Sequence, residues 1–352
     1  MAQQHLDPTD PTAGTATGDA LAGYLRARAT EFLRALRLHR ETGGTAGGGE
    51  ESVDAARALR RSARRISASL HTYRPLLDAA WAESMRPELA WVSGTLALEH
   101  AYEARLERLL QALHRLSGAT ALPGRPAAAA GPAGPAGGPP ATAADRASLT
   151  VGAAKAGALL DRQLTLARTR AHSTALQALG SSRFHAVADK VAVLASEVPL
   201  VPAAPATELH PLAAAAQERL TDAVAALPLL TAGHPYNAQA LVHGLSPDPS
   251  PHPQDGPWHQ VRLLMRLHRY AREVLHGDTP VDARLLTAGQ ALNRHRDASE
   301  AAAAAAQAAR TPRITPATAY ALGVLHADQR HEVEASRFAF QRAWLKETVE
   351  AV

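Results

Sequence analysis

The stretch WHQVRLLMRLHRYAREVLH, residues 258–276, has the apolar spacing of a single amphipathic α-helix. At about 100° of rotation per residue, its cations fall in a stripe about 80° wide, formed by His259, Arg262, Arg266 and Arg269. The rest of the helix surface is mostly apolar, whereas a solvated face is normally broader and mixed in sign. The pattern therefore predicts a helix that packs on most sides and lines a groove with its cations.

The composition predicts an all-α protein. Apolar residues make up 46% of the 352 residues, enough for a core, while aromatic residues make up only 4%. Alanine dominates, and hardly any segment alternates as a strand does. The absence of cysteine excludes disulfides and thiolate chemistry. No basic leader or long apolar run stands out, so we expect no membrane association and a cytoplasmic location.

Helical patterning recurs along the chain and is broken by a Pro/Gly/Ala-rich stretch, LPGRPAAAAGPAGPAGGPPATAAD, at residues 122–145. Such a composition is typical of a linker. We expect helices at about 19–40, 51–74, from there to about 116, and at 148–179, 182–198, 208–231, 258–276, 281–310 and 316–349. The division predicted is a disordered tail (1–17), a first helical half (18–118), a linker (119–147) and a second helical half (148–352).

The two halves resemble each other. At an offset of 202 residues, the helix expected at 51–74 matches the one at 258–276, with Arg57, Arg60 and Arg64 opposite His259, Arg262 and Arg266. The fourth cation of the second row, Arg269, corresponds to Ser67. In each half a glycine also precedes a histidine by six residues, Gly94 before His100 and Gly289 before His295. These matched positions together indicate an internal duplication.

The basic rows need a counter-charge. Two cations about 4 Å apart repel by about 4 kcal/mol at an effective dielectric of 20, so the rows require an anion or carboxylates from other helices. Glu273 lies on the second row, and no acid lies within the span of the first. A charge-assisted hydrogen bond to a bound oxyanion contributes on the order of 1.5–3 kcal/mol. The rows therefore favour a groove for a polyanion over a solvated face.

The sequence offers no catalytic or metal-binding constellation. HEVE at 331–334 lacks the second histidine of a zinc-hydrolase helix, because residue 335 is alanine. HRD at 295–297 is followed by alanine at 302, where a kinase loop needs asparagine. We therefore predict no enzyme activity, no cofactor and no metal.

The helix HQVRLLMRLHRYAREV (259–274) resembles the signature helix of the CHAD family, the histidine-containing α-helical domains. RALRRSARRISASLHTYRPLL (57–77) is similar to the family's first basic helix, and LNRHRDA (292–298) to its later histidine-aspartate segment. Weaker matches lie at 181–191 and 322–344. The sequence departs from the family pattern at Arg57, Ser67 and His100-Ala101, and in its scarcity of lysine.

The resemblance implies two pseudo-symmetric four-helix-bundle halves around a central basic cavity that binds inorganic polyphosphate. It also implies association with bacterial polyphosphate granules and, as partners, polyphosphate-metabolising proteins. The expected binding residues are Arg57, Arg60, Arg61, Arg64, His259, Arg262, Arg266, Arg269 and His295. Three alternatives stay open: a degenerate helical scaffold that docks a protein, a nucleic-acid binder using the same charge, and a polyphosphate hydrolase. The low aromatic content disfavours single-strand binding, because stacking platforms are then few.

Overall fold

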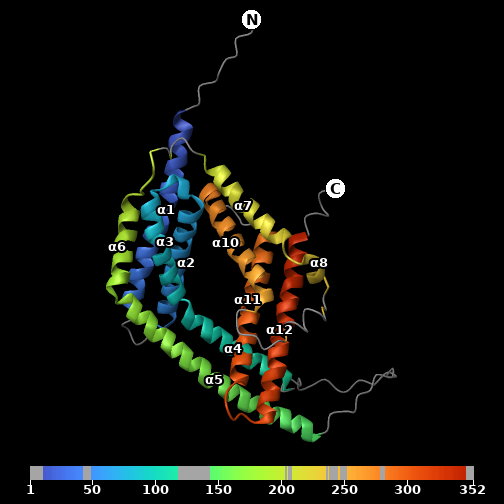
Figure 1. The fold of residues 1–352 in the computed structure, drawn as a ribbon. Helices are drawn as coiled ribbons and strands as arrows, with labels where there is room; N and C mark the ends of the chain where they lie inside the picture. The colour runs from blue at the N-terminus through green and yellow to red at the C-terminus, as the bar shows by residue number, and fades with distance from the viewer. Residues whose placement is uncertain are drawn as a thin grey trace, which may run out of the picture. The chain divides into compact units, whose positions relative to one another are not determined.

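Helices make up the regular structure of the described chain (Figure 1). A computed structural model describes residues 11–42, 49–117, 143–202, 204, 208–234, 237, 245, 252–277 and 282–345. Strand-like pairing in these residues is limited to an isolated antiparallel bridge between Leu77 and Leu200. The all-α prediction is therefore confirmed.

The helices are mostly long, as expected from an alanine-rich sequence. They are α1 (Pro11–Thr42), α2 (Gly49–Thr72), η1 (Arg74–Leu76), α3 (Ala79–Thr95), α4 (Leu98–Leu116), α5 (Ala143–Leu179), α6 (Ser182–Ser196), α7 (Leu209–Ala225), α8 (Leu229–Ala232), η3 (Pro253–Asp255), α10 (Gly256–His276), α11 (Ala283–Ala309) and α12 (Pro316–Leu345).

Two helices begin earlier than the sequence pattern predicts. Helix α1 starts at Pro11, inside the expected tail, and α5 starts at Ala143, inside the expected linker. Both extensions are small and polar, so they carry no apolar period to reveal them. A proline is tolerated in the first turn, and alanine extends a helix readily. Residues 1–10 and 119–142, the rest of those two segments, lie outside the described residues.

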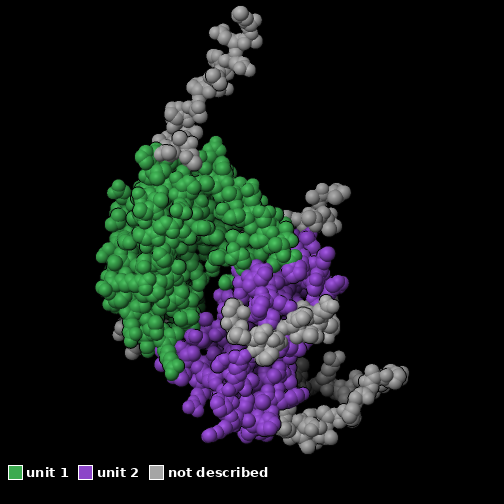
Figure 2. Space-filling view, viewed as in Figure 1, with its two compact units in different colours: residues 1–99, 170–227, 260–285 green, residues 100–169, 228–259, 286–352 purple. Residues whose placement is uncertain are grey.

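The chain divides into two compact units, coloured separately in Figure 2. Unit 1 comprises residues 1–99, 170–227 and 260–285, and unit 2 comprises residues 100–169, 228–259 and 286–352. Each unit draws on segments from before and after the expected linker. The compact units thus differ from the two sequence halves, and the division into duplicated halves stays a prediction.

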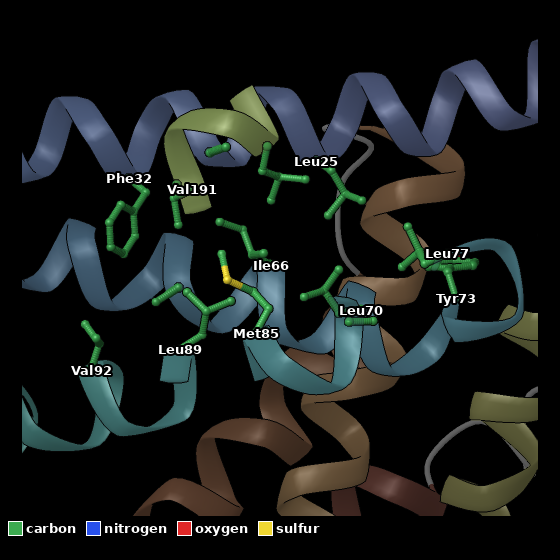
Figure 3. Close-up of a cluster of buried hydrophobic side chains, with 14 of the residues drawn as sticks. Leu25, Phe32, Ile66, Leu70, Tyr73, Leu77, Met85, Leu89, Val92 and Val191 are labelled. Carbon is green, nitrogen blue, oxygen red and sulfur yellow. The ribbon is translucent and has the colours of Figure 1, made fainter. Parts of the chain in front are cut away.

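The core of unit 1 is built from large apolar side chains. Figure 3 shows them gathered between α1, α2 and α3, with a contribution from α6; they include Leu25, Phe32, Ile66, Leu70, Met85, Leu89 and Val191. Local sequence signals begin two of these helices: the Asp78 carboxylate accepts from the backbone of Trp81 at the start of α3, and the Ser181 hydroxyl accepts from Phe184 at the start of α6. Such caps stabilise a helix by about 1 kcal/mol.

The core of unit 2 relies on small side chains. Alanines of α11 pack against leucines of α4, α5 and α12, among them Ala301, Ala305, Leu109, Leu160 and Leu322. A Cβ atom added at Gly152 of α5 would stand 2.7 Å from the carbonyl carbon of Ala317 in α12, and closer still to its oxygen. This close helix approach explains how a chain with few aromatic residues still forms a packed core.

Candidate polyanion-binding site

The basic row of α10 lies on a helix whose opposite face is buried. Val261, His268 and Ala271 are at most 6% exposed and form that face. The cations of the row, His259, Arg262, Arg266 and Arg269, are half-buried. Partial burial of this kind is typical of long cationic side chains at a packed surface.

Helix α2 has the same construction. Its buried face is formed by Leu59, Ala63, Ile66 and Leu70, each fully buried in the core of unit 1. On the other side, Arg60 and Arg64 are half-buried, and Arg57 and Arg61 are exposed. The four predicted contacts on α2 thus differ in exposure, with Arg60 and Arg64 closest in character to the row on α10.

Glu273 joins α10 to α2 and α1 within unit 1. One carboxylate oxygen, Oε2, lies 2.9 Å from Arg65 Nε and accepts a hydrogen bond from the Tyr24 hydroxyl at 3.2 Å. The other oxygen, Oε1, lies 3.6 Å from Arg269 Nε. Close by, the Tyr73 hydroxyl donates to the backbone carbonyl of Ala271 at 2.9 Å. The C-terminal ends of the two basic helices are therefore held together around one acid.

The pKa values of Tyr24 and Arg65 are affected by the nearby Glu273 carboxylate. Burial raises the pKa of the Tyr24 phenol, and the negative charge of Glu273 raises it further. Burial on its own would lower the pKa of Arg65, but the attraction of and hydrogen bond to Glu273, together with Tyr24 and Tyr270, outweigh it, so the net shift is upward. Both shifts follow in part from the closeness of Tyr24 and Arg65 to the Glu273 carboxylate.

The first row has a carboxylate just outside its span. Arg57 Nη1 donates to Asp54 Oδ1 at 2.6 Å, because residues three apart on a helix are neighbours. The pair is exposed, with 55% of the arginine and 72% of the aspartate side chain accessible, so it contributes little to stability. Acids therefore stand at the N-terminal end of the α2 row and at the C-terminal end of the α10 row.

A buried ionic network lies in unit 2, next to the first residues of α10. Its centre is Asp255, which has no exposed surface. Arg330 Nη1 donates to Asp255 Oδ2 at 2.8 Å, Arg337 Nη2 donates to Oδ1 at 2.7 Å, and the Ser299 hydroxyl donates to Oδ2. Arg337 also donates to Glu334 at 2.7 Å. Two arginines and two acids thus balance in charge inside the unit.

His295 belongs to this network and is 1% exposed. Arg337 Nε donates to His295 Nε2 at 3.3 Å, which requires that nitrogen to be unprotonated. Asp255 Oδ1 is 3.6 Å from the same nitrogen, beyond a normal hydrogen bond. Burial first, and then the charge of Arg337, lower the pKa of His295 to about 4 despite the attraction of Asp255. His295 is therefore a neutral, enclosed imidazole at neutral pH.

The rings around His295 connect the network to the start of α10. Trp258 stacks on His295 with ring centres 5.7 Å apart, and His259 meets it edge to face at 5.4 Å. The guanidinium of Arg337 lies over the Trp258 ring at 5.3 Å. His259, the first cation of the α10 row, is therefore positioned through His295 by the buried network.

The predicted site residues consequently fall into two groups. Unit 1 contains Arg262, Arg266 and Arg269 on α10 together with Arg57, Arg60, Arg61 and Arg64 on α2, whereas unit 2 contains His259 and His295. The sequence reasoning missed Arg65, Tyr24, Asp255, Arg330 and Arg337. The i, i+7 spacing of Arg330 and Arg337 on one helix face was an available signal. For Asp255, an acid in a proline-rich stretch, the sequence carried none.

Two further findings concern metal-binding groups and membrane-spanning helices. Among the described residues, no three His, Asp or Glu side chains are grouped so that they could hold a metal ion. Across the same part of the chain, every helix is too short or too polar to cross a membrane.

Comparison with known proteins gives the family. A family model described as the CHAD domain matches residues 27–306, a range that includes α2, α10 and His295. Among solved structures, the chain is similar to PptA from Streptomyces chartreusis, with 73% identity and a TM-score of 0.76 over 93% of this chain and 99% of that one. No curated protein matches the sequence. The chain belongs to the CHAD domain family.

Proposed function

We propose that this protein binds inorganic polyphosphate, without turnover, along the basic faces of α2 and α10. The observation that supports this most directly is the half-buried cation row of α10, on a helix whose opposite face is buried. Family membership supports the same ligand, because CHAD domains are a polyphosphate-binding family. The central basic cavity expected from the resemblance stays a prediction.

The spacing of the rows suits a linear polyanion. Arginines at i, i+3 and i+7 on α2, and at i, i+4 and i+7 on α10, place several guanidinium groups along one edge of each helix, each able to bind phosphate oxygens as a planar fork. Polyphosphate presents oxyanions at every repeat, so Arg262, Arg266 and Arg269 on α10 could each engage a successive segment of one chain. Arg60 and Arg64 would add contacts from α2, with Arg57 and Arg61 at the exposed margin.

The two histidines take different roles in this proposal. His259 is half-buried at the head of the α10 row, so it is a candidate direct contact. His295 is enclosed and neutral, which argues against direct contact with a phosphate chain. We therefore assign His295 to positioning the ring of His259.

A charge-reversal pair tests the proposal. Arg262→Glu with Arg266→Glu removes two contacts and adds repulsion, so polyphosphate affinity should fall by about 100-fold or more at low salt. The control is Arg162→Glu with Arg170→Glu, which changes the formal charge equally at two exposed residues of α5. Binding to fluorescently labelled polyphosphate is the measurement. Equal affinity for the two double variants and the wild type would contradict the proposed site.

Further experiments distinguish the proposed function from its alternatives. Competition between polyphosphate and a mixed-sequence oligonucleotide should favour polyphosphate, and the reverse result would indicate a nucleic-acid binder. Phosphate release above a blank, lost in the Arg262/Arg266 variant, would establish an enzyme instead. A wild-type protein that binds no polyphosphate at all would favour a helical scaffold. For granule association, a fluorescent fusion should co-localise with polyphosphate granules in cells and disperse when the two arginines are reversed.

A further inference from the structure

We propose that Glu273 limits the affinity of the basic row by neutralising, as an internal carboxylate, Arg65 and Arg269, which would otherwise bind a phosphate. The inference rests on the proposed polyphosphate binding and adds two elements to it. One is a further cation, Arg65, and the other is an acidic residue that closes the row at its C-terminal end. The polymer would therefore be held along Arg262 and Arg266 and weakly beyond them.

Glu273 is contacted by a hydroxyl donor and two guanidinium groups from three helices of unit 1. Tyr24 of α1 donates to Oε2 at 3.2 Å, Arg65 of α2 lies 2.9 Å from the same oxygen, and Arg269 of α10 lies 3.6 Å from Oε1. A hydroxyl and two guanidinium groups that converge on one carboxylate are also groups that can bind a phosphate oxygen. The Glu273 carboxylate thus takes the polar partners that a phosphate oxygen of the ligand would also take.

The charge of the cluster shows what removal of this carboxylate would do. Around Glu273 stand three cations, Arg28, Arg65 and Arg269, and one further acid, Glu31, which pairs with Arg28 at 3.0 Å and lies 3.9 Å from Arg65. The net charge of the cluster is therefore +1 with Glu273 ionised and +2 without it. Half-exposed Arg269, with 43% of its side chain accessible, is open to a ligand.

Glu273→Gln is a suitable variant because it removes the charge and keeps the shape. The amide oxygen still accepts from Tyr24 or Arg65, so packing around the residue is retained. A gain of affinity is also a result that misfolding does not produce. At low salt we expect Glu273→Gln to bind polyphosphate about threefold to tenfold more tightly, since one charge-assisted contact at a partly exposed site is gained.

Two further variants make the test specific. Glu41→Gln is the matched control, because Glu41 pairs with Arg37 at 2.7 Å on the exposed surface of α1, and its loss changes the net charge equally. Arg65→Met in the Glu273→Gln background removes the cation that the inference assigns to the new contact. The experiment compares polyphosphate affinity across wild type, both single variants and the double variant, with thermal unfolding recorded for each.

We expect Glu273→Gln to gain affinity for polyphosphate and Glu41→Gln to show no comparable gain. In the double variant the gain should be lost. Equal gains for the two single variants would overturn it in favour of a net-charge effect. An unchanged or weaker affinity in a folded Glu273→Gln protein would also overturn it, while leaving wild-type binding intact. If Glu273→Gln unfolds, Glu273→Met, which keeps the volume of the side chain, is judged by the same criteria. Wild-type protein that binds no polyphosphate would instead refute the proposed function itself.

Discussion

Asp255 and Glu273 show how two acids of similar surroundings play different parts in this protein. Asp255 is fully buried between Arg330, Arg337 and Ser299, where no ligand reaches it. Glu273 lies at the end of a basic row, next to a partly accessible arginine. The first therefore serves the stability of unit 2, and the second is placed to influence binding.

Removing the buried acid should be costly. Asp255→Asn leaves Arg330 and Arg337 with a neutral partner in a dry interior, and breaking a buried ion pair in this way costs about 3–5 kcal/mol. Asp54→Asn is the control, because the Asp54–Arg57 pair is exposed and should contribute less than about 1 kcal/mol. Denaturant unfolding of both variants measures the difference. Equal free energies of unfolding would contradict the importance of the network.

The enclosed histidine makes stability depend on pH. The pKa of His295 is about 4 in the folded protein and 6.5 at its ordinary value, so between these pH values the unfolded chain binds a proton that the native state does not. Stability should therefore decrease as the pH falls from 6.5 to 4, by on the order of 2–3 kcal/mol from this residue. The pKa of the Asp255 carboxyl is held below its usual range. Below pH 4, its protonation should lower the stability of the protein further.

Substitution isolates the contribution of His295. His268 also has a pKa lowered by burial and acts in the same direction, so the comparison needs His295→Gln beside the wild type. Thermal unfolding followed from pH 7 to 4 should show a shallower decline for His295→Gln. Parallel curves for the two proteins would show that His295 titrates normally.

Among the secondary-structure elements, two glycines inside helices should respond oppositely to substitution. A methyl group at Gly152 of α5 would lie 2.7 Å from the Ala317 carbonyl carbon, so Gly152→Ala should force α5 and α12 apart and destabilise unit 2 by about 1–3 kcal/mol. At Gly23 of α1 nothing lies within 4 Å of the added carbon. Gly23→Ala should therefore stabilise the protein by about 0.5–1 kcal/mol. Thermal unfolding of the two variants checks the sign of each effect.

The helices with a strong apolar period could be predicted from the sequence. Helical segments that lack such a period could not. The pattern of 258–276 located α10 within two residues, because its buried face and its cations alternate at the helical period. The early starts of α1 and α5 were missed, since PTAGTATG and AADRA carry small or polar residues on every side. The close contact of Gly152 with Ala317 depends on a neighbour that is distant in the chain.

The candidate site was predictable to the same degree. The rows on α2 and α10 followed from residue spacing within one helix, and the structure places the arginines of both in unit 1. The convergence of Tyr24, Arg65 and Arg269 on Glu273 joins residues up to 249 positions apart, which no local pattern reveals. The burial of His295 likewise depends on Asp255 and Arg337, from segments on either side of it.

For the whole molecule, binding should depend on local charge more than on net charge. The formal net charge is only +4 over 352 residues, too little to attract polyanions strongly at a distance. Cations gathered on the two helices would account for affinity at close range. Each contact with a phosphate releases condensed counterions, so affinity should fall steeply with salt.

The salt dependence of polyphosphate binding tests this account most directly. Between about 50 and 300 mM salt, the logarithm of the wild-type binding constant should fall with the logarithm of salt concentration by roughly 0.7–0.9 per phosphate contacted, about 4–5 in all for six contacts. Arg262→Gln with Arg266→Gln should reduce that slope by about 1.5–2. A wild-type slope near zero, or one unchanged in the double variant, would contradict binding of polyphosphate by the arginine row of α10.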